Sequence, residues 1–165
     1  MVHQEQLVSD VEKFLTSGRP LVFKVKKIHP LAQMPSREHG EENAGFDLSS
    51  VENVELAAGD RYLFSTGLQV SCPSGWWLKF HDRSGNAYKR GLHVLAGVID
   101  NGYRGELKVL LLNINKKDSV PVAVCVGDRI AQMTQERMPE GEFQEEFDDL
   151  DASIRGINGF GSTGN

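Results

Sequence analysis

The stretch GVIDNGYRGE, residues 97–106, places the pair Asn101-Gly102 between two apolar runs, LHVLAGVI before it and ELKVLLLNI after it. An Asn-Gly pair between strand-like segments is the strongest short signal for a β-hairpin with a two-residue type I′ turn. In such a hairpin Asp100 and Tyr103 are directly opposed and point to the same face of the sheet. The sequence therefore predicts a β-ribbon with a carboxylate and a phenol ring side by side at its tip.

Short apolar runs continue on both sides of this ribbon. LVFKVKKI begins at Leu21, and RYLFSTGLQV, WWLKF and VPVAVCV follow along the chain. They are rich in valine and leucine, have the length of strands and are separated by turn residues, which is typical of an all-β sandwich or barrel. One helical signal interrupts them, SGNAYKRG at residues 84–91, and it is long enough for one or two turns.

Length and composition indicate one globular domain with extensions at both ends. The chain has 165 residues, of which 39% are apolar, and 17 glycines, close to an ordinary globular composition. An apolar helical stripe within residues 5–16 predicts a helix that ends before Gly18. We therefore divide the chain into an N-terminal helical extension (1–20), a β core (21–137), an acidic linker (138–154) and a glycine-rich, flexible C-terminal arm (155–165).

Charge and hydropathy exclude several classes of protein. The net charge of −5 argues against a general nucleic-acid binder, and no apolar run approaches the ~18 residues of a membrane helix. No signal peptide is recognisable at the N-terminus, so we expect a cytoplasmic protein, or a nuclear one if the source is eukaryotic or viral. Cys72 and Cys125 are expected to be reduced, buried thiols, and the scattered histidines do not predict a zinc site.

The glycine-rich C-terminus, RGINGFGSTG at residues 155–164, carries groups suited to a nucleotide. A guanidinium, hydroxyls and open amides bind polyphosphate, and an aromatic ring stacks on a base; here these are Arg155, Ser162, Thr163 and Phe160. The segment is not a Walker motif, because no lysine follows its glycines. The alternative is a glycine tail without a role.

Three further segments offer polar side chains beside apolar ones. In DRSGNAYKRG (82–91), Arg83 and Ser84 stand at the start of the predicted helix, where anions bind; the alternative is a serine N-cap with an arginine in a surface ion pair. In AGFDLSS (44–50), Asp47 could hold metal-bound water, and in GDRIAQM (127–133), Gln132 could reach a phosphate oxygen. For these two, and for Asp100 with Tyr103, the alternative is turn capping and packing.

Taken together and in this order, the five segments closely resemble the five motifs of the trimeric deoxyuridine triphosphate nucleotidohydrolases (dUTPases), over residues 21–164. The resemblance implies a distorted β-barrel or jelly roll that assembles as a homotrimer, with each active site drawing on three subunits. It also implies dUTP as substrate and Mg²⁺ as cofactor. The products would be dUMP, which supplies thymidylate synthesis, and pyrophosphate, and the reaction would keep uracil out of DNA.

The resemblance implies a role for each matching residue. Asp100 would activate the water that attacks the α-phosphorus, with Ser84, Asp47 and Gln132 completing the catalytic set, and Asp47 would act on Mg²⁺ indirectly, through water. Tyr103 would lie against the deoxyribose and exclude a 2′-hydroxyl. The other substrate contacts would be backbone groups at Gly97, Val98, Ile99 and Lys108 for uracil, Arg83, Ser84, Gly85 and Gln132 for phosphates, Arg155 for the γ-phosphate, Phe160 over the base, and Gly161, Ser162 and Thr163 around the phosphates.

Four positions depart from the pattern of the family. Asp82 stands where proline is usual, and its charge beside a phosphate site predicts weaker triphosphate binding. Asn86 replaces an apolar residue, and Gly102 replaces a frequent acidic residue. Lys108 occupies a position that is often small or apolar, but a backbone contact there does not depend on the side chain.

Two other functions remain open from the residues. A dCTP deaminase has a similar fold, but that family places a glutamate three residues before the asparagine that closes the second strand of the hairpin. Here the asparagine is Asn113 and the corresponding residue is Leu110, which cannot transfer protons. The second alternative is a nucleotide-binding or regulatory protein that keeps the fold with little catalysis.

Overall fold

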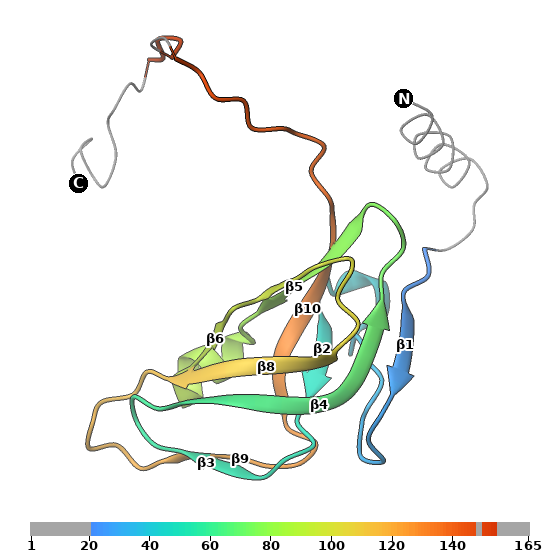
Figure 1. Ribbon diagram of the computed structural model, residues 1–165. Helices are drawn as coiled ribbons and strands as arrows, with labels where there is room; N and C mark the ends of the chain where they lie inside the picture. The colour runs from blue at the N-terminus through green and yellow to red at the C-terminus, as the bar shows by residue number, and fades with distance from the viewer. Residues whose placement is uncertain (1–20, 148–149, 155–165) are drawn as a thin grey trace.

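Antiparallel sheets form nearly all of the regular structure in this computed structural model, which describes residues 21–147 and 150–154 (Figure 1). The predicted N-terminal helix and the C-terminal arm lie outside the described residues. The first sheet has the order β1-β4-β8-β6, the second β2-β10-β5-β7 and the third β3-β9. The strands are β1 (Lys24–Lys27), β2 (Phe46–Ser49), β3 (Val54–Leu56), β4 (Arg61–Ser71), β5 (Trp76–His81), β6 (Leu92–Leu95), β7 (Val98–Ile99), β8 (Glu106–Asn113), β9 (Val122–Val124) and β10 (Arg129–Arg137).

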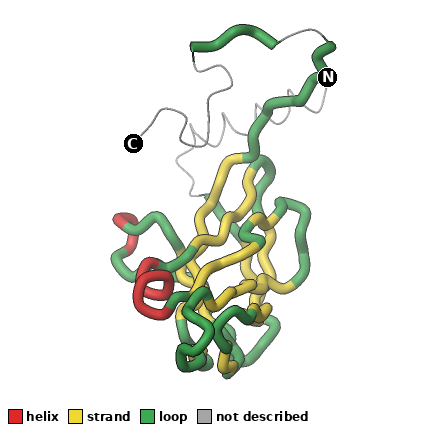
Figure 2. The backbone as a smooth tube through the Cα atoms, turned by 90° about the vertical axis from the view of Figure 1, so that its left-hand side faces the viewer, coloured by secondary structure: helices red, strands yellow, loops and turns green. Residues whose placement is uncertain are grey.

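The all-β fold predicted from the apolar runs is confirmed, although the sheets of the described chain remain open and do not close into one continuous barrel. The predicted internal helix is present as η2 (Asn86–Arg90), and a second short segment, η1 (Gly40–Glu42), was not predicted. Both helical segments lie on one side of the strands (Figure 2). No helix in the described ranges is long and apolar enough to cross a membrane.

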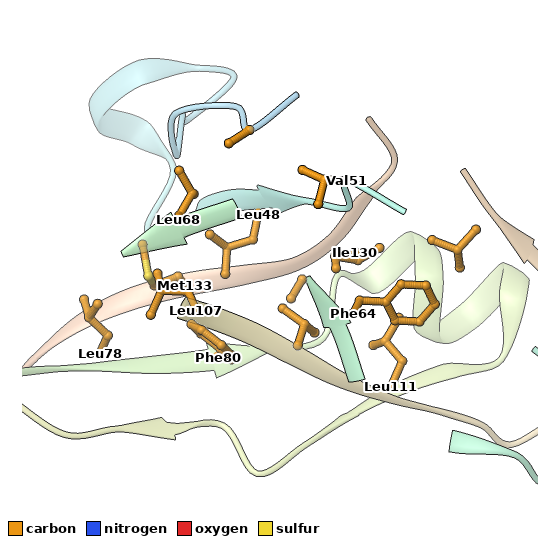
Figure 3. Close-up of a cluster of buried hydrophobic side chains, with 14 of the residues drawn as sticks. Leu48, Val51, Phe64, Leu68, Leu78, Phe80, Leu107, Leu111, Ile130 and Met133 are labelled. Atoms are coloured by element: carbon orange, nitrogen blue, oxygen red, sulfur yellow. The ribbon is translucent and has the colours of Figure 1, made fainter. Parts of the chain in front are cut away.

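The hydrophobic core lies between the two four-stranded sheets (Figure 3). Strands β4 and β8 alternate, so that Phe64, Leu107 and Leu111 point inward and are almost completely buried. Burial of each such side chain stabilises the fold by about 1.5–3 kcal/mol. The one buried hydroxyl in this stretch, on Thr66, donates to the carbonyl of Leu107 at 2.6 Å and so carries no desolvation penalty.

The predicted hairpin is wrong in its pairing. Strand β7 pairs with β5, with Val98 opposite Lys79 and Ile99 opposite Leu78, whereas β8 pairs with β4 and β6. The turn itself forms, because the amide of Tyr103 donates to the carbonyl of Asp100 at 3.1 Å. It is not of type I′, since neither of its central residues has a positive φ. The two strands therefore diverge into different sheets after one turn.

The acidic segment that follows β10 contains no helix or strand in its described part, and it leads away from the sheets (Figure 1). Its apolar side chains Phe143, Phe147 and Ile154 are almost fully exposed. The division of the chain at residue 138 remains a prediction.

Candidate active site

The divergence of β7 and β8 opens a hollow of about 230 Å³ beside the Asp100 turn, here called the turn hollow. Asp100 is exposed at its mouth, and within the described chain no group donates a hydrogen bond to its carboxylate. Asp100 therefore does not cap the turn amides, which was the alternative interpretation. The hollow is lined by Leu63, Val98, Ile99, Asp100, Tyr103, Glu106 and Lys108.

The ring of Tyr103 is fixed beside Asp100 by its own hydroxyl and by a glycine. The hydroxyl donates to the carbonyl of Glu106 at 2.9 Å. A Cβ at Gly105 would lie 2.4 Å from the same hydroxyl oxygen, so only glycine lets the ring lie over this backbone. Tyr103 is thus held as a flat wall of the turn hollow.

Gly97 has a different role from the predicted one. A Cβ there would lie 2.6 Å from the carbonyl oxygen of Phe80, and the Phe80 amide donates to the Gly97 carbonyl at 2.8 Å. Gly97 therefore allows β7 to lie close to β5. We had expected this glycine to leave the backbone open to a ligand.

Two side chains that the sequence analysis did not assign hold the Asp100 turn. The side-chain nitrogen Nδ2 of Asn101 donates to the carbonyls of Pro73 and Trp76, each at 2.8 Å. Arg104 donates from Nη1 to the carbonyl of Asn101 at 2.6 Å and to that of Tyr103 at 2.8 Å. The two carbonyls that Asn101 binds belong to residues 28 and 25 positions away in the sequence, so no local pattern could have revealed this anchor.

A second hollow, of about 330 Å³, gathers the remaining described candidates and is here called the polar hollow. Gln132 on β10 is opposed by Asp47 on β2, and its side chain donates to the carbonyl of Asp82 at 2.7 Å. Ser84 and Gly85, just after β5, are exposed. Three of the sequence motifs thus meet here, and the lining residues are Glu38, Glu42, Asn43, Ala44, Gly45, Asp47, Arg83, Ser84, Gly85 and Gln132.

Asp47 is the centre of a charge network in this hollow. Its Oδ1 accepts from Nε of Arg83 at 2.7 Å, and its Oδ2 accepts from Nη1 of Arg129 at 3.2 Å. The same Arg129 nitrogen lies 2.6 Å from Glu38, and this hydrogen bond together with the positive charge lowers the pKa of Glu38. The alternative interpretation of Arg83 was a surface ion pair. Arg83 does form an ion pair, with Asp47, but both residues line the polar hollow. Ser84 makes no side-chain cap on η2.

The departures Asp82 and Asn86 are both engaged with the scaffold. The carboxylate of Asp82 accepts from the amide of Val94 at 2.5 Å and lies 2.7 Å from Nδ1 of His93. Asn86 is buried and donates to the carbonyls of Arg129 and Ile130 at the start of β10. The effect of Asp82 on triphosphate binding stays a prediction.

Of the other two departures, Lys108 lines the turn hollow and Gly102 belongs to the Asp100 turn. A Cβ on Gly102 would meet nothing within 4 Å, so the side chain usual in the family is replaced by open space. The ammonium of Lys108 lies 3.6 Å from the carboxylate of Glu106.

The two hollows share no lining residue, so the described part of one chain separates Asp100 from Arg83 and Gln132. Arg155, Phe160, Gly161, Ser162 and Thr163 lie outside the described residues. Where the structure describes the chain, no three His, Cys, Asp or Glu residues are grouped as a metal site. Of the cysteines, Cys72 is buried as predicted, but Cys125 is exposed at a turn closed by Asp128, so its predicted burial was wrong.

The fold and the two hollows define a class of small antiparallel β-proteins with one hollow at an acidic turn and a second hollow lined by polar and charged side chains. Comparison with known proteins narrows this class: the dUTPase family model matches residues 31–164. The chain belongs to the dUTPase family.

Relatives from distant sources support the assignment. The chain is 44% identical to a deoxyuridine 5′-triphosphate nucleotidohydrolase of Paramecium bursaria Chlorella virus 1, over 85% of this chain and 96% of the relative. It is 41% identical to that of Thermobifida fusca (strain YX), over 96% and 86%. Among solved structures, the Staphylococcus bacteriophage 80alpha dUTPase with dUPNHPP has a TM-score of 0.76 and 28% identity, over 87% of this chain and 99% of that one. A dUTPase from phage phi11 of S. aureus with a structural Mg(II) ion has a TM-score of 0.69 and 25% identity, over 77% and 97%.

Proposed function

We propose that this chain hydrolyses dUTP to dUMP and pyrophosphate by attack of water on the α-phosphorus. The observation that carries the proposal is the exposed carboxylate of Asp100, free of described donors, beside the fixed ring of Tyr103. An ionised carboxylate only accepts hydrogen bonds, so Asp100 takes the proton of the attacking water. A positioned general base accelerates such a step by about 100- to 10,000-fold.

The turn hollow accommodates the nucleoside. Tyr103 presents a ring wall to the deoxyribose, where a 2′-hydroxyl would clash, and backbone groups around Val98, Ile99 and Lys108 bind uracil. The backbone of Gly97 contributes less directly, because its carbonyl already accepts from Phe80.

The polar hollow takes the phosphates. Arg83 uses Nε and Nη2 on Asp47, which leaves its Nη1 to donate to a phosphate oxygen. Ser84, Gly85 and Gln132 add a hydroxyl, an amide and a carboxamide. The C-terminal residues Arg155, Phe160, Gly161, Ser162 and Thr163 complete the site by binding the γ-phosphate, covering the base and enclosing the phosphates.

Magnesium fits the donors of the polar hollow. Mg²⁺ prefers oxygen ligands, retains several waters and uses one or two carboxylates with substrate phosphates. Both oxygens of Asp47 already accept from arginines, which suits contact with the ion through water. When bound, the ion offsets negative charge on the triphosphate.

We also propose a homotrimer in which active sites are shared. The two hollows share no lining residue within one chain, which supports a site that takes Asp100 and the phosphate contacts from different subunits. On the outer face of the first sheet, Leu63, Leu110 and Leu95 are directly opposed across β4, β8 and β6, and Leu63 is 50% exposed. Such an apolar row suits contact with another copy. Light scattering should give three times the mass of the chain, and a monomer would contradict this assembly.

One assay separates the candidate functions. The protein is incubated with dUTP, dCTP, dTTP or UTP, each with Mg²⁺, and pyrophosphate and ammonia are measured. Pyrophosphate from dUTP alone is expected. Ammonia from dCTP would indicate a deaminase, and neither product would indicate a nucleotide-binding protein. In the cell, a cytoplasmic or nuclear enzyme of this kind removes dUTP before it enters DNA and supplies dUMP for thymidylate synthesis.

A further inference from the structure

Glu38 lies on the rim of the polar hollow, and the sequence analysis gave it no role. It belongs to the loop between β1 and β2, which includes η1. Its carboxylate lies 2.6 Å from Nη1 of Arg129, and this nitrogen is also 3.2 Å from Asp47. Glu38 is therefore connected to the centre of the hollow through one shared cation, while 57% of its side chain remains exposed.

The loop holds Glu38 in this place by its own closure. Arg37 donates to the carbonyl of Asn43 at 3.2 Å, and its guanidinium lies 4.7 Å from the centre of the Phe46 ring. The amide of Asp47 donates to the carbonyl of Ser36 at 2.8 Å. The two residues just before Glu38 are thus tied to β2, so the negative charge of Glu38 stays at the hollow.

The charges around the polar hollow favour a ligand of reduced negative charge. Glu38, Glu42 and Asp47 line it, against two guanidiniums, that of Arg83 in the lining and that of Arg129, which pairs with Glu38 and Asp47. A free nucleoside triphosphate carries a charge of about −4 and its Mg²⁺ complex about −2, so Coulomb repulsion by one fixed carboxylate is about twice as large for the free form. A carboxylate on the rim therefore opposes the metal-free nucleotide more strongly than the complex.

We propose that Glu38 is a specificity-determining residue that makes the site prefer the magnesium complex of the nucleotide over the metal-free nucleotide. The proposal rests on the proposed function, because it takes the polar hollow as the triphosphate site. It assigns to Glu38 an effect on binding and none on the chemical step.

The test is calorimetric binding of dUPNHPP, the ligand of the phage 80alpha dUTPase structure, with Mg²⁺ and separately with EDTA. Removal of one negative charge by Glu38→Gln should tighten binding about tenfold for the metal-free ligand and about threefold for the Mg²⁺ complex. The matched control is Glu41→Gln, since Glu41 is an exposed residue of the same loop that does not line the hollow. Its affinities should stay within about twofold of the unmodified chain in both conditions.

The outcomes separate the two levels of inference. An equal gain in both conditions, no gain, or weaker binding by Glu38→Gln would overturn the role of Glu38, and weaker binding would show that it positions Arg129. A gain in affinity of the same size in Glu41→Gln would also overturn it, because the gain would then come from the net charge of the chain and not from the position of Glu38. If the unmodified chain binds dUPNHPP in neither condition, the proposed function fails and the role of Glu38 fails with it.

Discussion

Gly45 and Gln132 approach each other so closely that no side chain fits at position 45. A Cβ built there would lie 2.5 Å from Oε1 of Gln132. Gln132 is the residue that joins β10 to Asp82 by a side-chain hydrogen bond at 2.7 Å. Gly45 therefore sets the conformation of a proposed phosphate ligand on the neighbouring strand.

Gly45→Ala should displace the Gln132 carboxamide, because the end of a flexible side chain moves more readily than backbone. We expect the KM for dUTP to rise about tenfold, the equivalent of about one neutral hydrogen bond. The measurement is steady-state kinetics of pyrophosphate release. Gly141→Ala is the matched control, since a Cβ there would meet nothing within 4 Å; an unchanged KM in Gly45→Ala would show that Gln132 does not bind phosphate.

Asp100→Asn should lower kcat by about 100- to 10,000-fold, because the carboxamide cannot accept the proton of the attacking water. Binding of dUPNHPP should change little, since the side chain keeps its size. Asp118→Asn, in an exposed loop away from both hollows, should retain full turnover. Full turnover in Asp100→Asn would remove this residue from the mechanism.

Asn101→Ala should loosen the Asp100 turn, because the carbonyls of Pro73 and Trp76 lose their common donor. We expect a loss of about 1–3 kcal/mol in the free energy of unfolding and a decrease in kcat of about 10- to 100-fold from misplacement of Asp100. Urea unfolding and steady-state kinetics measure these effects.

The comparison variant for Asn101 is Asn115→Ala, which removes a carboxamide that donates to the carbonyl of Arg90 at 2.8 Å, away from the turn. It should lose stability with kcat unchanged. A parallel decrease of kcat in both variants would mean that Asn101 acts only through general stability.

The sequence predicted the strand-forming runs well, for a physical reason. Burial alternates along β4 and β8, and this local pattern can be predicted directly from the spacing of apolar residues. Asp47, Gln132, Arg83 and Ser84 became candidates because their segments resemble motifs of the family, and the structure brings them together around the polar hollow.

Pairing between strands could not be predicted in the same way. The Asn-Gly signal described the turn, but β7 is only two residues long and finds its partner in β5. The close contact of Gly97 with Phe80 and the anchor of Asn101 on Pro73 and Trp76 decide this, and both are long-range. Glu38 was missed for the same reason, since its partner Arg129 lies 91 residues away.

The two cysteines should differ sharply in reactivity. Burial raises the pKa of the Cys72 thiol above its usual value of 9.0, whereas Cys125 is exposed. At neutral pH a thiol reagent should therefore label one cysteine per native chain and two after denaturation, and Cys125→Ser should label only after denaturation. Because the folded chain retains the Cys72 proton more tightly than the unfolded chain, this thiol's contribution to stability is present below pH ~9 and is lost as the pH rises further. Rapid native labelling of Cys72 would contradict its burial.

Removal of residues 155–165 should abolish hydrolysis and leave the trimer intact. The polar hollow has three lining carboxylates against the guanidiniums of Arg83 and Arg129, which is too little positive charge for a triphosphate, and Arg155 is the one arginine that residues 155–165 would add. The proposed trimer contacts lie on the outer face of β4, β8 and β6, so they do not depend on these residues. Pyrophosphate release measures hydrolysis by the truncated chain, and light scattering measures its assembly. The point variant Arg155→Ala should lose hydrolysis in the same way. If the shortened chain becomes monomeric, the C-terminus holds the assembly together, and its proposed role as a phosphate-binding arm must be revised.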